Sequence, residues 1–231
     1  MVDSGSALLA GGCIATIIPL IFTSVMVKDR SSRWILLYLC WGTLAGLLAY
    51  LGTGWFTAAP GQAHRVVTSA APVVEEVLKA LPLLLFLWSY LHPRVTKLIV
   101  YCAMASGVGF SIQESIHYFA ASSGAVGDFF VLGIRTITTA LMHGMTTAIF
   151  GLGLLFLHKQ RQILLPVIFG LLSLSITIHA LFNLLLPTSL AVVAMLMPVG
   201  LYFGGLWLLN SYEENSYQPT EHLVRKDDIY G

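Results

Sequence analysis

The sequence predicts an all-α membrane protein in which about seven helices cross the lipid bilayer. Three observations predict this class: 57% of the 231 residues are hydrophobic, only 10% are charged, and the mean hydropathy is +0.82. Soluble domains carry about 25% charged residues, so the composition excludes an ordinary soluble domain. The net charge of +1 leaves no basic excess, and no nucleic-acid partner is expected.

Seven apolar stretches are long enough to cross the hydrocarbon core, which takes about 20 helical residues. They are expected at residues 7–27, 34–57, 72–91, 97–121, 129–157, 163–186 and 190–210. The polar connections between them are too short for a soluble domain. We therefore expect a single transmembrane domain over 1–210, with its motif-bearing core at about 72–186, and a polar, disordered cytoplasmic tail over 211–231.

The basic residues indicate how the helices are oriented. Of the twelve Lys and Arg residues, nine fall in the first, third and fifth connections and the tail, whereas the opposite connections contain only Arg65. The other two, Lys79 and Arg135, lie within apolar stretches. Because cytoplasmic loops are enriched in Lys and Arg, the N-terminus is expected outside and the C-terminus in the cytoplasm. We therefore expect a multi-pass protein of the plasma membrane.

Polar side chains interrupt the third to sixth apolar stretches. A charge at the bilayer centre costs about 2.5–3.5 kcal/mol on insertion scales, so such residues usually face a cavity or one another. Those in this chain are Glu75, Glu76, Lys79, Glu114, Arg135, His143, His179 and Asn183. Glu75 and Lys79 are four residues apart, as are His179 and Asn183, so each pair shares one helix face. Their depths predict one cleft that opens toward the extracytoplasmic half of the membrane.

These residue types suit hydrolysis of a peptide bond, which needs a base for water, donors for the oxyanion and an acid for the leaving amine. Burial beside a like charge makes a carboxylate more basic, so any of the glutamates could be the base. His179 and Asn183 could donate to the oxyanion. Carboxylates and imidazoles also suit zinc. If zinc is present, the expected ligands are Glu75, Glu114, His143 and His179.

Simpler interpretations remain open for some of these residues. Glu76 and Lys79 also suit an ion pair that lets the third helix insert, and Arg135 could extend to the outer interface. The chain has no GxSxG and no HExxH motif. It also has no Gly-Leu-Gly-Asp motif and no paired intramembrane Asp, which would mark an aspartyl protease. Serine and aspartyl intramembrane proteases are therefore disfavoured.

The order of the polar motifs resembles the PrsW family of intramembrane proteases, in the superfamily that includes the CAAX prenyl endopeptidases and the APH subunit of γ-secretase. The residues from Glu75 to Lys79 match EExxK, and Phe110 with Glu114 forms the next motif. Arg135 and His143 follow, and residues 179–183 match HxxxN. Four motifs in this order on consecutive apolar helices carry the resemblance.

The resemblance implies an endopeptidase that cleaves a single-span membrane protein, with anti-sigma factors as the known kind of substrate. It also implies roles for individual residues. Glu75 would activate water with help from Glu114, His179 and Asn183 would form the oxyanion hole, Glu76 and His143 would support the site, and Lys79, Arg135 and Phe110 would assist. The family has been described both as metalloprotease and as metal-independent, so zinc is a possible cofactor.

Two other functions compete with proteolysis. The acids and histidines could form a proton or cation path in a transporter, although the motifs occur once and not in repeated halves. The chain could also be a catalytically inactive scaffold of the same fold. The presence of all three glutamates, Glu75, Glu76 and Glu114, argues against a scaffold.

Overall fold

The computed structural model describes residues 4–57, 70–89, 97–121, 126–157 and 161–216, and these contain helices but no strand. The α-helices are α1 (Ser4–Met26), α2 (Arg30–Thr57), α4 (Ala71–Ser89), α5 (Leu98–Ala121), α6 (Val126–Leu157), α7 (Leu164–Leu185) and α8 (Ala191–Ser216), and the short 3-10 helix η2 covers Arg161–Ile163. Each apolar stretch predicted from the sequence corresponds to one of these helices. The predicted all-α class is confirmed.

Helix α8 is longer than the last apolar stretch. That stretch ends at residue 210, where the polar tail was expected to begin, yet α8 continues to Ser216. The Tyr212 ring packs edge-on against Phe156 of α6, with the ring centroids 5.4 Å apart. This contact joins the start of the polar segment to the helical core. The rest of the predicted tail, 217–231, lies outside the described residues.

Four described helices are long and apolar enough to cross a membrane. Their apolar segments are Arg30–Gly52, Val131–Phe156, Leu164–Leu185 and Ala191–Tyr212. Helix α1 adds the shorter apolar segment Ala10–Met26. Helices α4 and α5 are not among the four, and they contain the glutamates of the EExxK motif and Glu114. The molecule is therefore a membrane protein. Its polar motifs lie on two helices that meet this criterion, α6 and α7, and on two that do not, α4 and α5.

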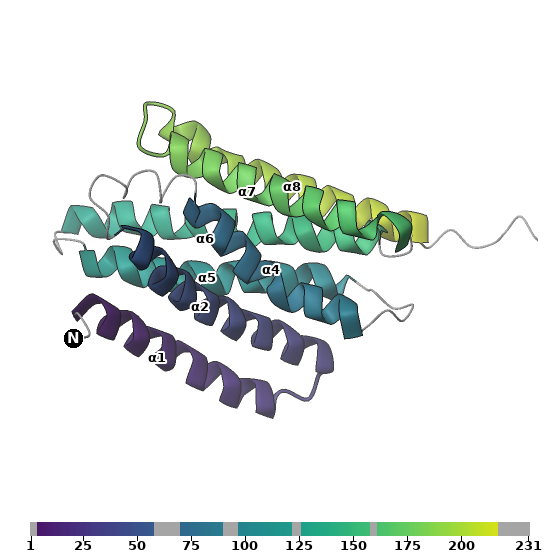
Figure 1. The fold of residues 1–231 in the computed structure, drawn as a ribbon, viewed down its shortest axis with the longest axis horizontal. Helices are drawn as coiled ribbons and strands as arrows, with labels where there is room; N and C mark the ends of the chain where they lie inside the picture. The colour runs from purple at the N-terminus through teal and green to yellow at the C-terminus, as the bar shows by residue number, and fades with distance from the viewer. Residues whose placement is uncertain (1–3, 58–69, 90–96, 122–125, 158–160, 217–231) are drawn as a thin grey trace, which may run out of the picture.

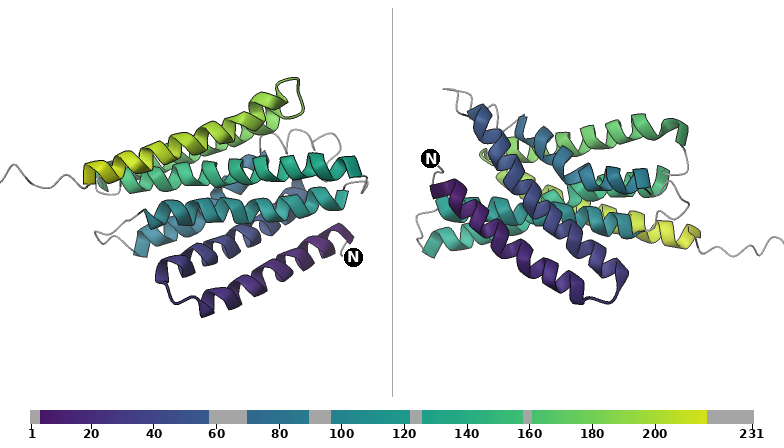
Figure 2. Two further views of the ribbon diagram at one scale, coloured as in Figure 1. Left: turned by 180° about the vertical axis from the view of Figure 1, so that it is seen from behind. Right: turned by 60° about the horizontal axis from the view of Figure 1, so that its bottom comes forward.

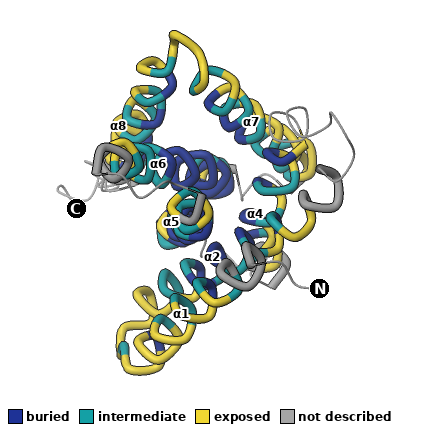
Figure 3. The backbone as a smooth tube through the Cα atoms, turned by 90° about the vertical axis from the view of Figure 1, so that its left-hand side faces the viewer, coloured by how far each residue is buried: buried dark blue, intermediate teal, exposed yellow. Residues whose placement is uncertain are grey.

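Helices α5 and α6 form the centre of the bundle. Helix α2 packs on α5 and α1 packs on α2, whereas α7 and α8 pack on α6 (Figure 1). The end-on view in Figure 3 shows buried residues concentrated on α5 and α6 and exposed residues on the outer side of α1. Successive helices run in opposite directions along the bundle, as both views in Figure 2 also show. Helix α4 contacts α2, α5, α6 and α7, so its side chains lie where four helices meet.

A proline fixes how α4 sits against α2. Pro82 lies inside α4 and has no backbone N–H, so the carbonyl of Leu78, four residues earlier, loses its helical hydrogen bond. The indole Nε1–H of Trp41 donates to that carbonyl at 2.9 Å. The Tyr38 hydroxyl donates to the carbonyl of Pro82 at 3.1 Å. Helix α2 thus satisfies the carbonyl that the proline leaves free, and the register of α4 is set beside it.

Glycines bring the central backbones into direct contact. A Cβ atom at Gly107 of α5 would lie 2.0 Å from the carbonyl oxygen of His143 in α6. A Cβ atom at Gly109 would lie 2.1 Å from the carbonyl oxygen of Leu39 in α2. Only glycine permits such a close approach of two helix backbones. These contacts place His143 directly against α5, at the level of the polar residues.

Candidate active site

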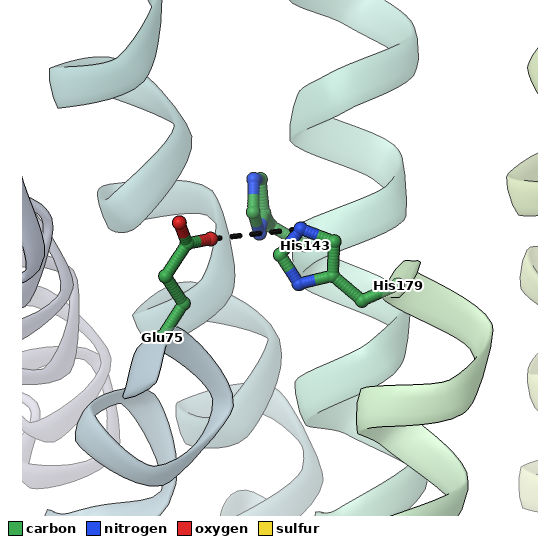
Figure 4. A group of neighbouring side chains, drawn as sticks. All are labelled: Glu75, His143 and His179. Carbon is green, nitrogen blue, oxygen red and sulfur yellow. Dashed lines mark ion pairs between the residues drawn. The ribbon is translucent and has the colours of Figure 1, made fainter. Parts of the chain in front are cut away.

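The polar motifs converge from four helices. Glu75 and Glu76 come from α4, Glu114 from α5, His143 from α6 and His179 from α7. The two histidine rings meet edge to face, with centroids 4.8 Å apart and an interplanar angle of 87°. Figure 4 shows Glu75 pointing toward both rings. Residues separated by more than a hundred positions in the sequence, such as Glu75 and His179, therefore share one site.

Glu76 is fully enclosed by hydrogen-bond donors. Its side chain is 2% exposed, and its Oε1 atom lies 2.6 Å from Lys79 Nζ, 2.8 Å from His179 Nδ1 and 3.1 Å from Thr146 Oγ1. The Ser175 hydroxyl in turn donates to the carbonyl of Thr146 at 2.7 Å. A buried carboxylate with this many donors is held in place. Glu76 ties α4 to α6 and α7.

A second chain of contacts runs from Lys79 to Glu114. Lys79 Nζ lies 2.9 Å from His143 Nδ1, and His143 Nε2 lies 2.6 Å from Glu114 Oε2. The Phe110 ring covers this chain, with its centroid 4.9 Å from that of His143 and 5.2 Å from Lys79 Nζ. Both nitrogens of the His143 ring are therefore in contact with a charged or polar partner.

Glu75 and Glu114 form the accessible side of the site. Their side chains are 18% and 25% exposed, whereas Glu76 is 2% exposed and His143 and His179 are buried. Glu75 Oε2 lies 3.5 Å from His179 Nε2, the pair marked in Figure 4. These two carboxylates are therefore the partly exposed groups at the rim of the histidine pair.

Asn183 and Arg135, both predicted site residues, lie at the edge of this cluster. Asn183 is half-buried one turn after His179 on α7, and its side chain makes no hydrogen bond to the residues that the structure describes. The Arg135 guanidinium carbon lies 3.6 Å from the ring centroid of Tyr118. Within the described chain the Arg135 Nε atom is buried without a hydrogen-bond partner. Arg135 thus packs on Tyr118, whose side chain hydrogen-bonds to Glu114. This places Arg135 beside Glu114 and not against the histidines.

Two residues of the site are not part of any motif considered above. The Tyr118 side chain hydrogen-bonds to Glu114, and Thr146 donates to Glu76. Helical spacing was the available signal, because Tyr118 is four residues after Glu114 and Thr146 three after His143, so each shares a face with a motif residue. A lone tyrosine or threonine in an apolar helix is too common for that signal to stand out.

Three side chains form a group that could hold a metal ion. Glu75, His143 and His179 each offer a ligand atom, and these atoms lie within 4.8 Å of one another. The contact between His179 Nδ1 and Glu76 suits a metal-bound histidine, whose second nitrogen usually donates to a carboxylate. His143 does not fit, because Lys79 and Glu114 contact its two nitrogens. Glu75 and His179 therefore remain as two possible metal ligands, whereas a catalytic zinc site has three protein ligands.

The zinc set predicted from the sequence is thus found only in part. Glu114 is absent from the metal-capable group, and its Oε2 atom is in contact with His143 Nε2 at 2.6 Å. Glu75 and His179 remain the two ligands whose contacts leave room for an ion.

The fold and the site define a helical membrane protein with a buried carboxylate–histidine centre. Residues 30–209 match the family described as PrsW family intramembrane metalloprotease. The chain therefore belongs to the PrsW family, whose members are intramembrane proteases, and the predicted resemblance is confirmed. The matched segment runs from the start of α2 almost to the end of α8. No match was found among curated proteins or among solved structures.

Proposed function

We propose that the chain is an intramembrane endopeptidase in which the Glu75 carboxylate activates a water molecule. The observation that carries this proposal is the contrast between two adjacent glutamates. Glu75 is partly exposed and faces His179 Nε2 at 3.5 Å, whereas Glu76 is enclosed by Lys79, Thr146 and His179. A general base must reach water, so Glu75 suits the chemistry and Glu76 suits support of the site.

The proposed reaction uses the side chains at the rim. Glu75 takes a proton from water while the water oxygen attacks the carbonyl carbon of the scissile bond. Asn183 and a protonated His179 Nε2 donate to the oxyanion, which is the usual way of stabilising this intermediate. The C–N bond then breaks, and the proton held by Glu75 passes to the leaving amine. Glu114, hydrogen-bonded to His143, assists as the second accessible carboxylate.

The proposed substrate is a single-span membrane protein, and an anti-sigma factor is the kind that the family resemblance suggests. The site is built from helices that lie in the bilayer, so a substrate has to enter from the lipid. We also propose seven membrane crossings in the plasma membrane, with the N-terminus outside. The alternating directions of successive helices and the opposite ends at which α1 begins and α8 ends (Figure 1) support this topology.

Purified protein in lipid nanodiscs, mixed with tagged single-span membrane proteins, tests the proposal. The Glu75→Gln and His179→Ala variants are each expected to lose cleavage by about 10²-fold or more, because general acid–base catalysis contributes about 10²–10⁴-fold. Fragments are identified by mass spectrometry. Glu214→Gln, in the last turn of α8, is the matched control and should cleave normally. Full activity of Glu75→Gln would refute the assignment.

Proton transport is the second candidate, and one observation favours it. The contacts from Glu114 through His143, Lys79 and Glu76 to His179 form an unbroken hydrogen-bonded chain, which is how buried proton paths are built. Proteoliposomes containing a pH-sensitive dye separate the two functions. A proton flux that Glu76→Gln abolishes, with no cleavage of any membrane protein, would favour transport. Absence of both activities would favour an inactive scaffold.

A further inference from the structure

Lys79 lies at the junction of the two hydrogen-bonded chains. Its side chain is 0% exposed, and its ammonium contacts Glu76 Oε1 at 2.6 Å and His143 Nδ1 at 2.9 Å. It also lies 5.2 Å from the ring centroid of Phe110. The buried lysine therefore touches a carboxylate on its own helix and an imidazole on another.

The chemistry of an ammonium determines the direction of these hydrogen bonds. A charged lysine has three donors and no acceptor. Its 2.6 Å contact with the buried Glu76 carboxylate is the short distance of a charge-assisted hydrogen bond, and either charge would be costly to bury alone. Lys79 therefore donates to both partners. The Nδ1 atom of His143 has to accept with its lone pair.

We propose that Lys79 is a positioning residue that holds His143 in the tautomer with its proton on Nε2. A neutral imidazole carries one proton, and with Nδ1 accepting from Lys79 that proton is on Nε2. His143 Nε2 lies 2.6 Å from Glu114 Oε2, so it donates to this carboxylate. His143 is then a hydrogen-bond donor to Glu114 and not a metal ligand, which refines the proposed role of Glu114 in proteolysis and rests on it.

The same ion pair acts on the two histidines in opposite ways. The Glu76 carboxylate lies 2.8 Å from His179 Nδ1, and because a carboxylate only accepts, a proton is on that nitrogen. The Lys79 ammonium excludes a proton from Nδ1 of His143. Glu76 and Lys79 are three residues apart on one helix face, so the EExxK spacing presents an acceptor to one ring and a donor to the other.

Nitrogen-15 NMR of the full chain tests this directly. The protein is labelled at histidine, placed in nanodiscs, and its His143 signals are assigned by their loss in His143→Gln. We expect a neutral ring with the proton on Nε2. In Lys79→Met the ring is expected to lose this single tautomer, with cleavage slowed about 10²-fold or more, and Lys79→Arg should restore both in part. Lys28→Met, at an exposed position before α2, is the control and should change neither.

Zinc ions alone provide the second measurement, on the wild-type chain. The His143 nitrogens are expected to keep their shifts when zinc is added, whether or not the His179 signals move. A proton on Nδ1 of wild-type His143, an unchanged tautomer in Lys79→Met, or a zinc-induced shift of His143 Nε2 would each overturn the proposal. The NMR readouts need no cleavage assay, so a failed Glu75→Gln test and a failed tautomer test remain distinguishable. If Lys79→Met does not fold, the wild-type spectra still decide.

Discussion

Adjacent residues of the site have opposite surroundings. Successive residues of a helix point about 100° apart, so Glu75 and Glu76 cannot face the same partners. The result is one carboxylate at the rim, 18% exposed, and one that is 2% exposed and bonded to three donors. Glu75 is therefore placed at the rim of the site, whereas Glu76 links α4 to α6 and α7.

Tyr118 is a residue whose contribution can be isolated by removing a single oxygen atom. Tyr118→Phe keeps the ring under Arg135 and removes the hydroxyl that bonds to Glu114. A hydrogen bond to a charged group contributes about 1.5–3 kcal/mol to stability, so we expect a lower Tm. We also expect cleavage to slow about tenfold or more, because this bond holds Glu114 in place. Tyr101→Phe, at a position that is 48% exposed, is the control. Equal rates for Tyr118→Phe and wild type would show that the hydroxyl has no part in catalysis.

At the scale of helices, α4 depends on α2 for its register. Trp41→Phe removes the indole N–H that donates to the Leu78 carbonyl, which Pro82 has left without a helical partner. A buried acceptor left unsatisfied costs about 1–3 kcal/mol. We expect a lower Tm, measured by thermal unfolding in detergent, together with slower cleavage because α4 carries Glu75.

Trp207→Phe in α8 is the comparison for this effect, since Trp207 is 67% exposed. Its Tm is expected to stay near that of the wild type. Equal losses for the two tryptophan variants would mean that the Leu78 carbonyl does not depend on Trp41.

The contact between α5 and α6 is set by Gly107. An added Cβ atom would meet the His143 carbonyl oxygen at 2.0 Å, which forces two backbones apart. Overpacking of this kind costs about 1–3 kcal/mol, and His143 moves with its backbone, so Gly107→Ala should lower both Tm and cleavage. Gly170→Ala in α7, where nothing lies within 4 Å, should be tolerated. A Gly107→Ala variant with wild-type stability would contradict the packing.

At the scale of the whole molecule, the topology predicts which connections face which side. Ser31, in the first turn of α2, and Ser189, between α7 and α8, are both exposed. The start of α2 and the connection from α7 to α8 lie at opposite ends of the bundle (Figure 1). In sealed right-side-out vesicles, a membrane-impermeant maleimide should label Ser189→Cys directly and Ser31→Cys only after permeabilisation. The native Cys13, Cys40 and Cys102 are buried, which keeps the background low. The reverse pattern would invert the proposed orientation.

The class of protein and the set of polar residues follow from the sequence alone. Long apolar stretches with few charges predict membrane helices. In lipid the backbone has no water to bond to, and a helix satisfies its hydrogen bonds within one segment. The spacing from Glu75 to Lys79 and from His179 to Asn183 places residues on one face by local geometry alone. The cost of charges in lipid then predicts that such faces meet, and the structure brings Glu75, His143 and His179 together.

The tertiary structure alone decides which atom meets which. Helical spacing does not say that Lys79 contacts Nδ1 of His143 or that Glu114 contacts its Nε2, because both contacts join different helices. They depend on the close approach at Gly107 and on the register that Trp41 gives to α4. Local periodicity therefore selects the residues of the site, whereas packing between helices assigns each nitrogen and oxygen its partner.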